Sequence, residues 1–311
     1  MNITTKRIIL VCTILCLQAN IYAQGCSDAG FCTAGAMQGG KHTTDSTKSK
    51  TALGFSCSLG AGENGTLIIT PQLEGGIPIS QHYILEAKLP FNIASGNLGN
   101  HSGVGDVIIT CSREFTTHSK DMYVTATLGS RIGVNNANAS YNGMALPMPY
   151  QNSLGTTDII AGLSMAYTKY FSIAAGYQQP VIQYNKNSYL PQDVYPSVLT
   201  DTTYFASNHL VRKGDILLRA EGKYQWKSIL LAAGPLFIYH LGQDGISTST
   251  GSKAMLKGSE GATLNLAFSI SYNMKKSRLD LLGGTPFIVR DYRPDGLTRA
   301  WVVTLRYTGF R

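Results

Sequence analysis

The stretch GATLNLAFSISYNMKKSRLDLLGGTPFIV, from Gly261 to Val289, decides the fold class. Between Leu264 and Met274, apolar and aromatic residues occupy the even positions, whereas asparagine, alanine and serine occupy the odd ones. Because successive side chains of a β-strand point to opposite faces, this alternation predicts a strand with two different environments. The chain then turns at Lys275-Lys276-Ser277 and a second run follows. Such a hairpin fits either a soluble β-sandwich or a barrel in a membrane.

Similar segments recur along the whole chain, and no long helix is indicated. Most of them alternate as cleanly as the first. They are long enough to cross a bilayer at a tilt, which takes about 9–11 residues, whereas sandwich strands usually have about five or six. The expected strands are Thr51–Ala61, Gly65–Gly75, Ser80–Phe91, Gly103–Thr116, Asp121–Val134, Gly155–Lys169, Phe171–Tyr184, Val211–Trp226, Ser228–Leu241, Gly261–Met274, Ser277–Val289 and Arg299–Phe310.

The connections favour the membrane barrel. After the even strands they are short, reading GGIPI, THSK, KY, KS and KKS, whereas most of those after the odd strands are long. Short turns at one end and long loops at the other are typical of outer-membrane barrels, with the short turns in the periplasm. The sequence therefore predicts an all-β fold, a transmembrane antiparallel up-and-down barrel of about 12 strands, within roughly 10–14. The expected long loops are Asn92–Ser102, Asn135–Leu154, Asn185–Leu210, Gly242–Glu260 and Asp291–Thr298.

The N-terminus has the pattern of a secretory signal. Lys6 and Arg7 precede an apolar run from Ile8 to Leu17, and Ala23 offers a small residue for cleavage, which predicts a signal peptide over residues 1–23. A competing interpretation makes Cys26 a lipidated residue. Export then directs the chain to the outer membrane of a Gram-negative bacterium, with a short N-terminal segment over residues 24–50 and the barrel over residues 51–311.

Cysteine usage agrees with export. Cys26 and Cys32 in CSDAGFC are expected to form a disulfide in an oxidising periplasm. Cys57 and Cys111 fall on apolar faces of expected strands and behave as small hydrophobic residues. The cysteine spacing does not match a zinc site, so no metal and no cofactor are expected.

The net charge and its distribution limit the classes of partner that the sequence predicts. The formal net charge is +8, but the basic residues are scattered along the chain, so nucleic acid is not an expected partner. A basic barrel instead fits outer-membrane lipid and lipopolysaccharide as surroundings, the barrel-assembly machinery as a partner, and a small-molecule solute as cargo.

Four short motifs point to a family. CSDAGFCTAGA, GVGDVIIT, GTTDIIAGLS and RKGDILLR resemble FadL-like outer-membrane transporters of Bacteroidota, of the phenol-degradation type. The resemblance implies passive uptake or binding of a small hydrophobic solute through a barrel plugged by its N-terminal segment, here Gln24–Lys50. Two alternatives stay open: a general porin for polar solutes, and a structural or adhesin barrel that presents long extracellular loops.

Three aspartates form the first candidate site. Asp106, Asp158 and Asp215 each follow a glycine closely at the start of the fourth, sixth and eighth expected strands, which places them at the extracellular rim. A ring of carboxylates there would bind a cation or orient a solute. Alternatively, each aspartate caps backbone amides of its loop.

The remaining candidates lie in the lumen and the long loops. Mixed charges inside the barrel would pair across it or tune a water-filled channel. Aromatic and methionine side chains in the loops would shape an entry site or pack the loops. The expected lumen charges are Glu86, Lys88, Glu114, Arg131, Arg219, Glu221, Lys223 and Arg306, and the loop residues are Tyr141, Met144, Met148, Tyr150, Tyr189 and Tyr195.

An enzyme is not expected, and no catalytic residues are assigned. Outer-membrane hydrolases need a histidine with an aspartate or serine near the rim. His101 and His209 fall in expected loops near Asp106 and Asp215, so a dyad is conceivable, but no motif supports one.

Overall fold

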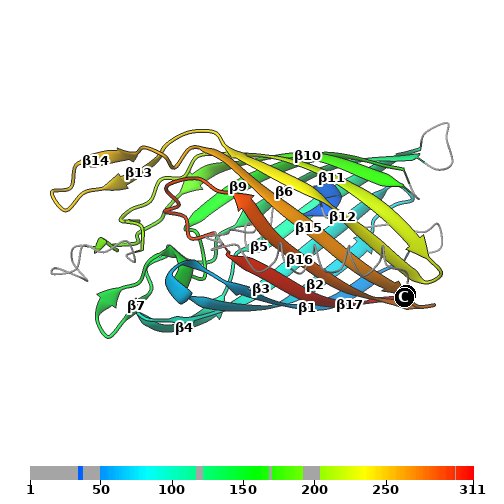
Figure 1. Ribbon diagram of the computed structural model, residues 1–311, viewed down its shortest axis with the longest axis horizontal. Coiled ribbons are helices and arrows are strands. Elements are labelled where there is room, and N and C mark those ends of the chain that lie inside the picture. Colours follow the sequence, from blue (N-terminus) through cyan, green and yellow to red (C-terminus); the bar gives the residue numbers. More distant parts are fainter. Residues whose placement is uncertain (1–33, 38–49, 117–121, 168–169, 192–203, 298) are drawn as a thin grey trace, which may run out of the picture.

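Twelve antiparallel strands close into a barrel in the computed structural model (Figure 1), which describes residues 34–37, 50–116, 122–167, 170–191, 204–297 and 299–311. The sheet runs in chain order around the barrel, and β1 pairs with β17 while β2 pairs with β3. The strands of the barrel wall are β1 (Ala52–Ala61), β2 (Leu67–Pro78), β3 (Tyr83–Gly96), β5 (Val107–Thr116), β6 (Met122–Ile132), β9 (Thr156–Tyr167), β10 (Phe171–Gln183), β11 (Asp215–Trp226), β12 (Ile229–His240), β15 (Gly261–Asn273), β16 (Ser277–Ile288) and β17 (Trp301–Phe310).

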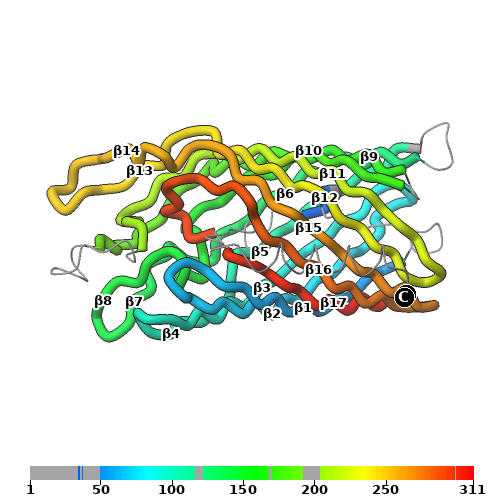
Figure 2. Tube along the Cα trace, viewed as in Figure 1, coloured from blue at the N-terminus to red at the C-terminus, as the bar shows by residue number. Residues whose placement is uncertain are grey.

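The two ends of the barrel differ, as Figures 1 and 2 show. Short turns join the strands at one end, here called the turn end, where the C-terminus lies. Longer connections lie at the other, the loop end, where three hairpin strand pairs and two 3₁₀ turns form. These are β4 (Gly99–Val104), which pairs with β3, β7 (Ser140–Tyr141) with β8 (Met144–Ala145), β13 (Asp244–Ser247) with β14 (Lys253–Leu256), η3 (Glu63–Gly65) and η4 (Met148–Tyr150).

The outer surface of the wall is apolar. On β15 the outward residues Leu266, Phe268, Ile270 and Tyr272 are exposed, whereas Asn265, Ser269 and Ser271 between them point inward and are buried. The same alternation holds on the other strands, so exposed large apolar side chains surround the barrel. A continuous apolar belt of this size is stable only against lipid, so the barrel spans a membrane. The alternation within Gly261–Val289 is therefore explained by lipid on one face and the lumen on the other.

Among the described residues, no helix has the length and apolar character to cross a membrane. Cys57 and Cys111 are unpaired and lie on the outer face of β1 and β5, in line with their expected role as small hydrophobic residues.

One expected connection is wrong. Asn92–Ser102 is predicted as a loop, but β3 continues to Gly96 and β4 begins at Gly99. The alternation of outward Ile93 and buried Ala94 extends β3 beyond the apolar belt, and Gly99 adopts a φ of +118° that lets the chain reverse tightly. The hairpins β7–β8 and β13–β14 also form inside segments that are expected to be plain loops.

Candidate functional site

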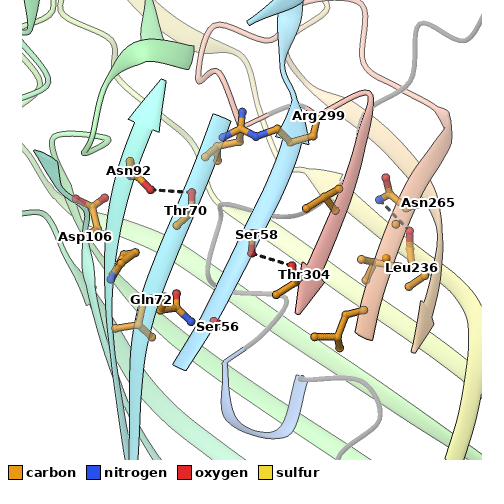
Figure 3. Close-up of a pocket in the computed structure, with 18 of the residues that line it drawn as sticks. Ser56, Ser58, Thr70, Gln72, Asn92, Asp106, Leu236, Asn265, Arg299 and Thr304 are labelled. Atoms are coloured by element: carbon orange, nitrogen blue, oxygen red, sulfur yellow. Dashed lines mark hydrogen bonds between the residues drawn. The ribbon is translucent and has the colours of Figure 1, made fainter. Parts of the chain in front are cut away.

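The interior of the barrel holds two chambers. The loop-end chamber has a volume of about 150 Å³ and extends from the loops to the middle of the barrel, between walls that carry Ser58, Thr70 and Asn92 on one side and Leu236 and Asn265 on the other (Figure 3). The turn-end chamber has a volume of about 200 Å³ and reaches down to residues such as Ala52, His82 and Phe310. Since the two chambers lie end to end, they outline a path through the barrel.

Three charged side chains separate the chambers. Arg219, Glu221 and Arg306 line both of them and are here called the charged waist. An Arg219 guanidinium nitrogen lies 3.7 Å from Oε1 of Glu221, and Nε of Arg306 donates to Glu74 over 3.1 Å. Because all three waist side chains are nearly buried, they narrow the lumen at mid-height.

The structure places all eight expected lumen charges on the inner face of the wall. Arg131 lines the loop-end chamber, and the other seven line the turn-end chamber. Further inward charges on the wall were not anticipated from the sequence. Glu74 pairs with Arg306, and Arg278 donates to Asp280 over 3.0 Å.

The three expected rim aspartates do lie at the loop end, but none of them faces another across an open site. Asp106 accepts the backbone N–H of Leu154 over 3.1 Å, which is the capping role that the sequence left open. Asp158 pairs with Arg131 and accepts a hydrogen bond from Gln178. No group of three or more histidine, cysteine or acidic side chains suited to a metal ion occurs within the described residues.

A buried ion network joins these aspartates to residues that the sequence did not single out. Arg212 is 1% exposed and lies 3.2 Å from Asp215 and 3.5 Å from Asp295, and Asp295 also accepts a 3.0 Å bond from Arg290. Burial lowers the pKa of the Arg212 guanidinium, but the surrounding carboxylates outweigh this and raise it further above its usual value. The network ties the β10–β11 loop to the β16–β17 loop, because Arg212 belongs to the first and Asp295 to the second.

His240 completes this loop-end ion network. Its Nδ1 lies 2.6 Å from Asp215 and its Nε2 lies 2.9 Å from Asp244. Each carboxylate, when ionised, accepts a hydrogen bond from the ring nitrogen that it faces, and the ring is then an imidazolium. The sequence does contain a signal for the contact between His240 and Asp215. The two-residue turn Lys227-Ser228 sets the register of β11 and β12, which places Asp215 opposite His240.

Above the network the loops pack into a cap. Asn187 Nδ2 donates to the carbonyls of Ala137 (3.0 Å) and Leu146 (2.9 Å), while its Oδ1 accepts from Tyr189 N (2.9 Å) and Ser207 Oγ (2.9 Å). One fully satisfied amide thus connects the β6–β9 loop with both ends of the β10–β11 loop. The loop cap is defined here as residues 146–154, 185–190, 204–210 and 295–297.

The expected loop aromatics divide between this cap and the surface. Tyr150 and Tyr189 are fully buried and pack edge-on against Tyr204, with ring centroids 5.7 Å and 6.5 Å away, and Met148 is also buried. In contrast, Tyr141 and Met144 lie exposed on the β7–β8 hairpin. Tyr195 lies outside the described residues.

A short piece of the N-terminal segment lies inside the barrel. Met37 of η2 (Gly35–Met37) and Ala34 just before it are fully buried against inward residues of the wall, and the Met37 side chain fills the space beside Gly162 on β9. Part of the expected plug therefore lies within the lumen. Cys26, Cys32 and the expected signal peptide over residues 1–23 lie outside the described residues.

The conceivable catalytic dyads do not form between the expected partners. His101 Nε2 contacts the Asn152 amide at 3.0 Å, and His209 Nδ1 contacts the neighbouring Asn208 at 2.7 Å. Among the described residues, the histidine that contacts aspartates is His240, which is buried between Asp215 and Asp244.

Comparisons with known proteins agree with this architecture. No protein-family model and no curated protein matches the sequence. The COG4313 outer membrane channel from Pseudomonas putida F1 superposes with a TM-score of 0.57 at 14% identity, covering 84% of this chain and 94% of that chain. The match to the KdgM porin covers 83% of this chain and 98% of that chain at 9% identity, with a TM-score of 0.42. The match to the NanC porin covers 84% of this chain and 99% of that chain at 10% identity, also with a TM-score of 0.42.

The fold, the apolar belt and the enclosed chambers together define the class of molecule. This chain has the fold of an outer-membrane β-barrel channel with twelve strands, and the likeness to the Pseudomonas putida channel shows that fold.

Proposed function

We propose that this chain resides in the outer membrane of a Gram-negative bacterium and passes a small solute through its lumen without energy coupling. The observation that carries the proposal is the pair of chambers that meet at the charged waist. By the usual orientation of such barrels, the loop end faces the outside and the turn end faces the periplasm. A solute would then enter beneath the loop cap and leave past the N-terminal segment, which acts as a partial plug.

The identity of the solute has two candidates. The chambers are lined by many hydroxyl, amide and paired charged side chains, which favours a small polar solute. The hydrophobic solute implied by the resemblance to FadL-like transporters is the second candidate, and one observation favours it. Ile108, Ile160, Leu217 and Leu236 form an apolar patch on the inner wall, which Ala34 and Met37 cover. Departure of the N-terminal segment would expose this patch to the lumen.

Liposome swelling tests the proposed passage. We expect vesicles that contain the folded chain to swell in small neutral solutes, with a rate that falls as solute size increases. Replacing both Arg219 and Glu221 by alanine should raise the rate several-fold, since the waist widens while the net charge stays the same.

The matched control is the double alanine variant of Arg278 and Asp280. This pair also lies two residues apart on one strand, and Arg278 lines only the turn-end chamber. The control should leave the rate unchanged. Absence of swelling in every solute, with a folded barrel confirmed by its heat-dependent gel shift, would favour a structural or adhesin barrel instead.

A further inference from the structure

We propose that the loop-end chamber is a binding site for small neutral polyhydroxylated molecules, such as a cyclic polyol or a monosaccharide. This inference rests on the proposed passage of a solute through the barrel and names the chemical class of that solute.

One wall of the chamber presents hydroxyl and amide groups on adjacent strands. Ser58 Oγ and Thr304 Oγ1 lie 2.8 Å apart, and either can be the donor, while Thr70 Oγ1 donates to Asn92 Oδ1 over 3.1 Å (Figure 3). Hydroxyl groups both donate and accept hydrogen bonds. They can therefore rearrange to match a ligand whose own hydroxyls also do both.

Most of the charges that line the chamber have partners of opposite sign, whereas Arg299 donates to the Gly296 carbonyl over 3.1 Å. Arg131 pairs with Asp158, Arg219 lies beside Glu221, and Asp295 is held by Arg212 and Arg290. An anion or cation that entered would compete with these existing pairs and would lose its hydration shell. The chamber therefore favours a neutral occupant.

The opposite wall is apolar and carries the unsatisfied acceptor. Leu236, Ala267 and Leu282 line this side. Asn265 is 2% exposed, and its Nδ2 donates to the Leu236 carbonyl over 3.3 Å, which fixes the amide so that Oδ1 is the free atom. Among the residues that the structure describes, neither Asn265 Oδ1 nor the Ser269 hydroxyl, further along the same strand, has a hydrogen-bond partner. Leaving such groups unpaired is unfavourable. Neighbouring groups cover both atoms in this structure, so a hydroxyl-bearing occupant would bond them after a small shift of the side chains that line the chamber.

The size of the chamber suits one ring. Its volume of about 150 Å³ equals that of an engineered protein cavity known to hold benzene. A cyclic polyol has hydroxyls around its edge and C–H groups on its faces, so it matches one polar and one apolar wall. A purely apolar ring of the same size would make no hydrogen bond with the polar wall and would leave Asn265 Oδ1 without a partner.

The test measures the equilibrium binding of small probe molecules to the folded full chain in detergent, with saturation-transfer NMR as the readout. The probes are myo-inositol, with six hydroxyls, and cyclohexanol, which has the same ring and one hydroxyl. We expect saturable binding of myo-inositol that is tighter than that of cyclohexanol. The substitutions Asn265→Leu and Ser269→Ala should each weaken it about tenfold, the loss expected for one hydrogen bond.

Ser271→Ala is the matched control, because Ser271 is buried on the same inward face of β15 and lines neither chamber. Equal effects of Ser269→Ala and Ser271→Ala would overturn the site, and tighter binding of cyclohexanol would overturn the ligand class. Lack of binding by either probe would mean that the chamber holds only water, which also overturns the proposal. Liposome swelling on the same preparation reports passage separately, so loss of swelling with binding retained would count against the channel and not against the site.

Discussion

At the scale of single residues, the contact between Met37 and Gly162 holds the N-terminal segment in the lumen. A Cβ atom at position 162 would overlap the sulfur of Met37, so the Met37 side chain keeps its present position only beside a glycine. Because Ala34 and Met37 also cover the apolar patch of the inner wall, their position links the seating of the segment to the character of the lumen.

Gly162→Ala is therefore expected to unseat the segment. Overpacking of this kind typically costs about 1–3 kcal/mol, so peroxide should oxidise Met37 roughly 5–150-fold faster than in the wild type. Peptide mass spectrometry measures this rate, and exposed Met144 serves as the internal reference.

Gly76→Ala is the control, since the new methyl group would lie 3.7 Å from Ala52 Cβ, an ordinary contact. Met37 oxidation at the wild-type rate in Gly162→Ala would show that the glycine does not hold the segment.

At the scale of elements, the loop cap depends on the ion network beneath it. Burial by itself would raise the pKa of Asp295, but the guanidinium groups of Arg290 and Arg212 outweigh burial and hold that pKa well below its usual range. The pKa of an aspartate in the unfolded chain is about 3.9. The network therefore stabilises the cap fully above that pH, and this stabilisation is lost as the pH falls below it.

We therefore expect the backbone amides of the cap between Ala206 and Leu210 to lose protection from hydrogen exchange below about pH 4. Their exchange rates should then rise beyond the change that the intrinsic pH dependence of amide exchange predicts. Asp295→Asn should remove this acid-dependent component. Asp291→Asn should keep it, because Asp291 lies exposed in the same loop. Identical pH profiles for Asp295→Asn and the wild type would assign the acid sensitivity to another group.

At the scale of the whole molecule, the sequence predicts the wall better than it predicts the interior. The two-residue alternation is local, and the contrast between lipid and lumen imposes it on every strand, so fold class and strand number follow from reading along the chain. The ion network is not local, since Arg212, His240 and Asp295 meet only after the barrel closes. Of these contacts, the sequence could have predicted only that of His240 with Asp215, because a two-residue turn sets the register of β11 and β12.

The loops were the least predictable part. Their buried amide and tyrosine contacts join segments far apart in sequence, such as Thr66 and Tyr204, whose hydroxyls lie 2.7 Å apart. Spacing along the chain carries no signal for such pairs. The inward position of Met37 was expected only through the family resemblance, because residues 24–50 show no alternation to place them.

In the proposed function, a path runs through the lumen and the N-terminal segment narrows it. Single-channel conductance in a planar bilayer tests both features, by comparing the mature chain with a variant that lacks residues 24–49. We expect small or rare current steps from the mature chain and discrete, larger steps from the shortened one. Silence from both folded proteins would contradict a continuous path, and equal steps from both would contradict the role of the segment as a plug.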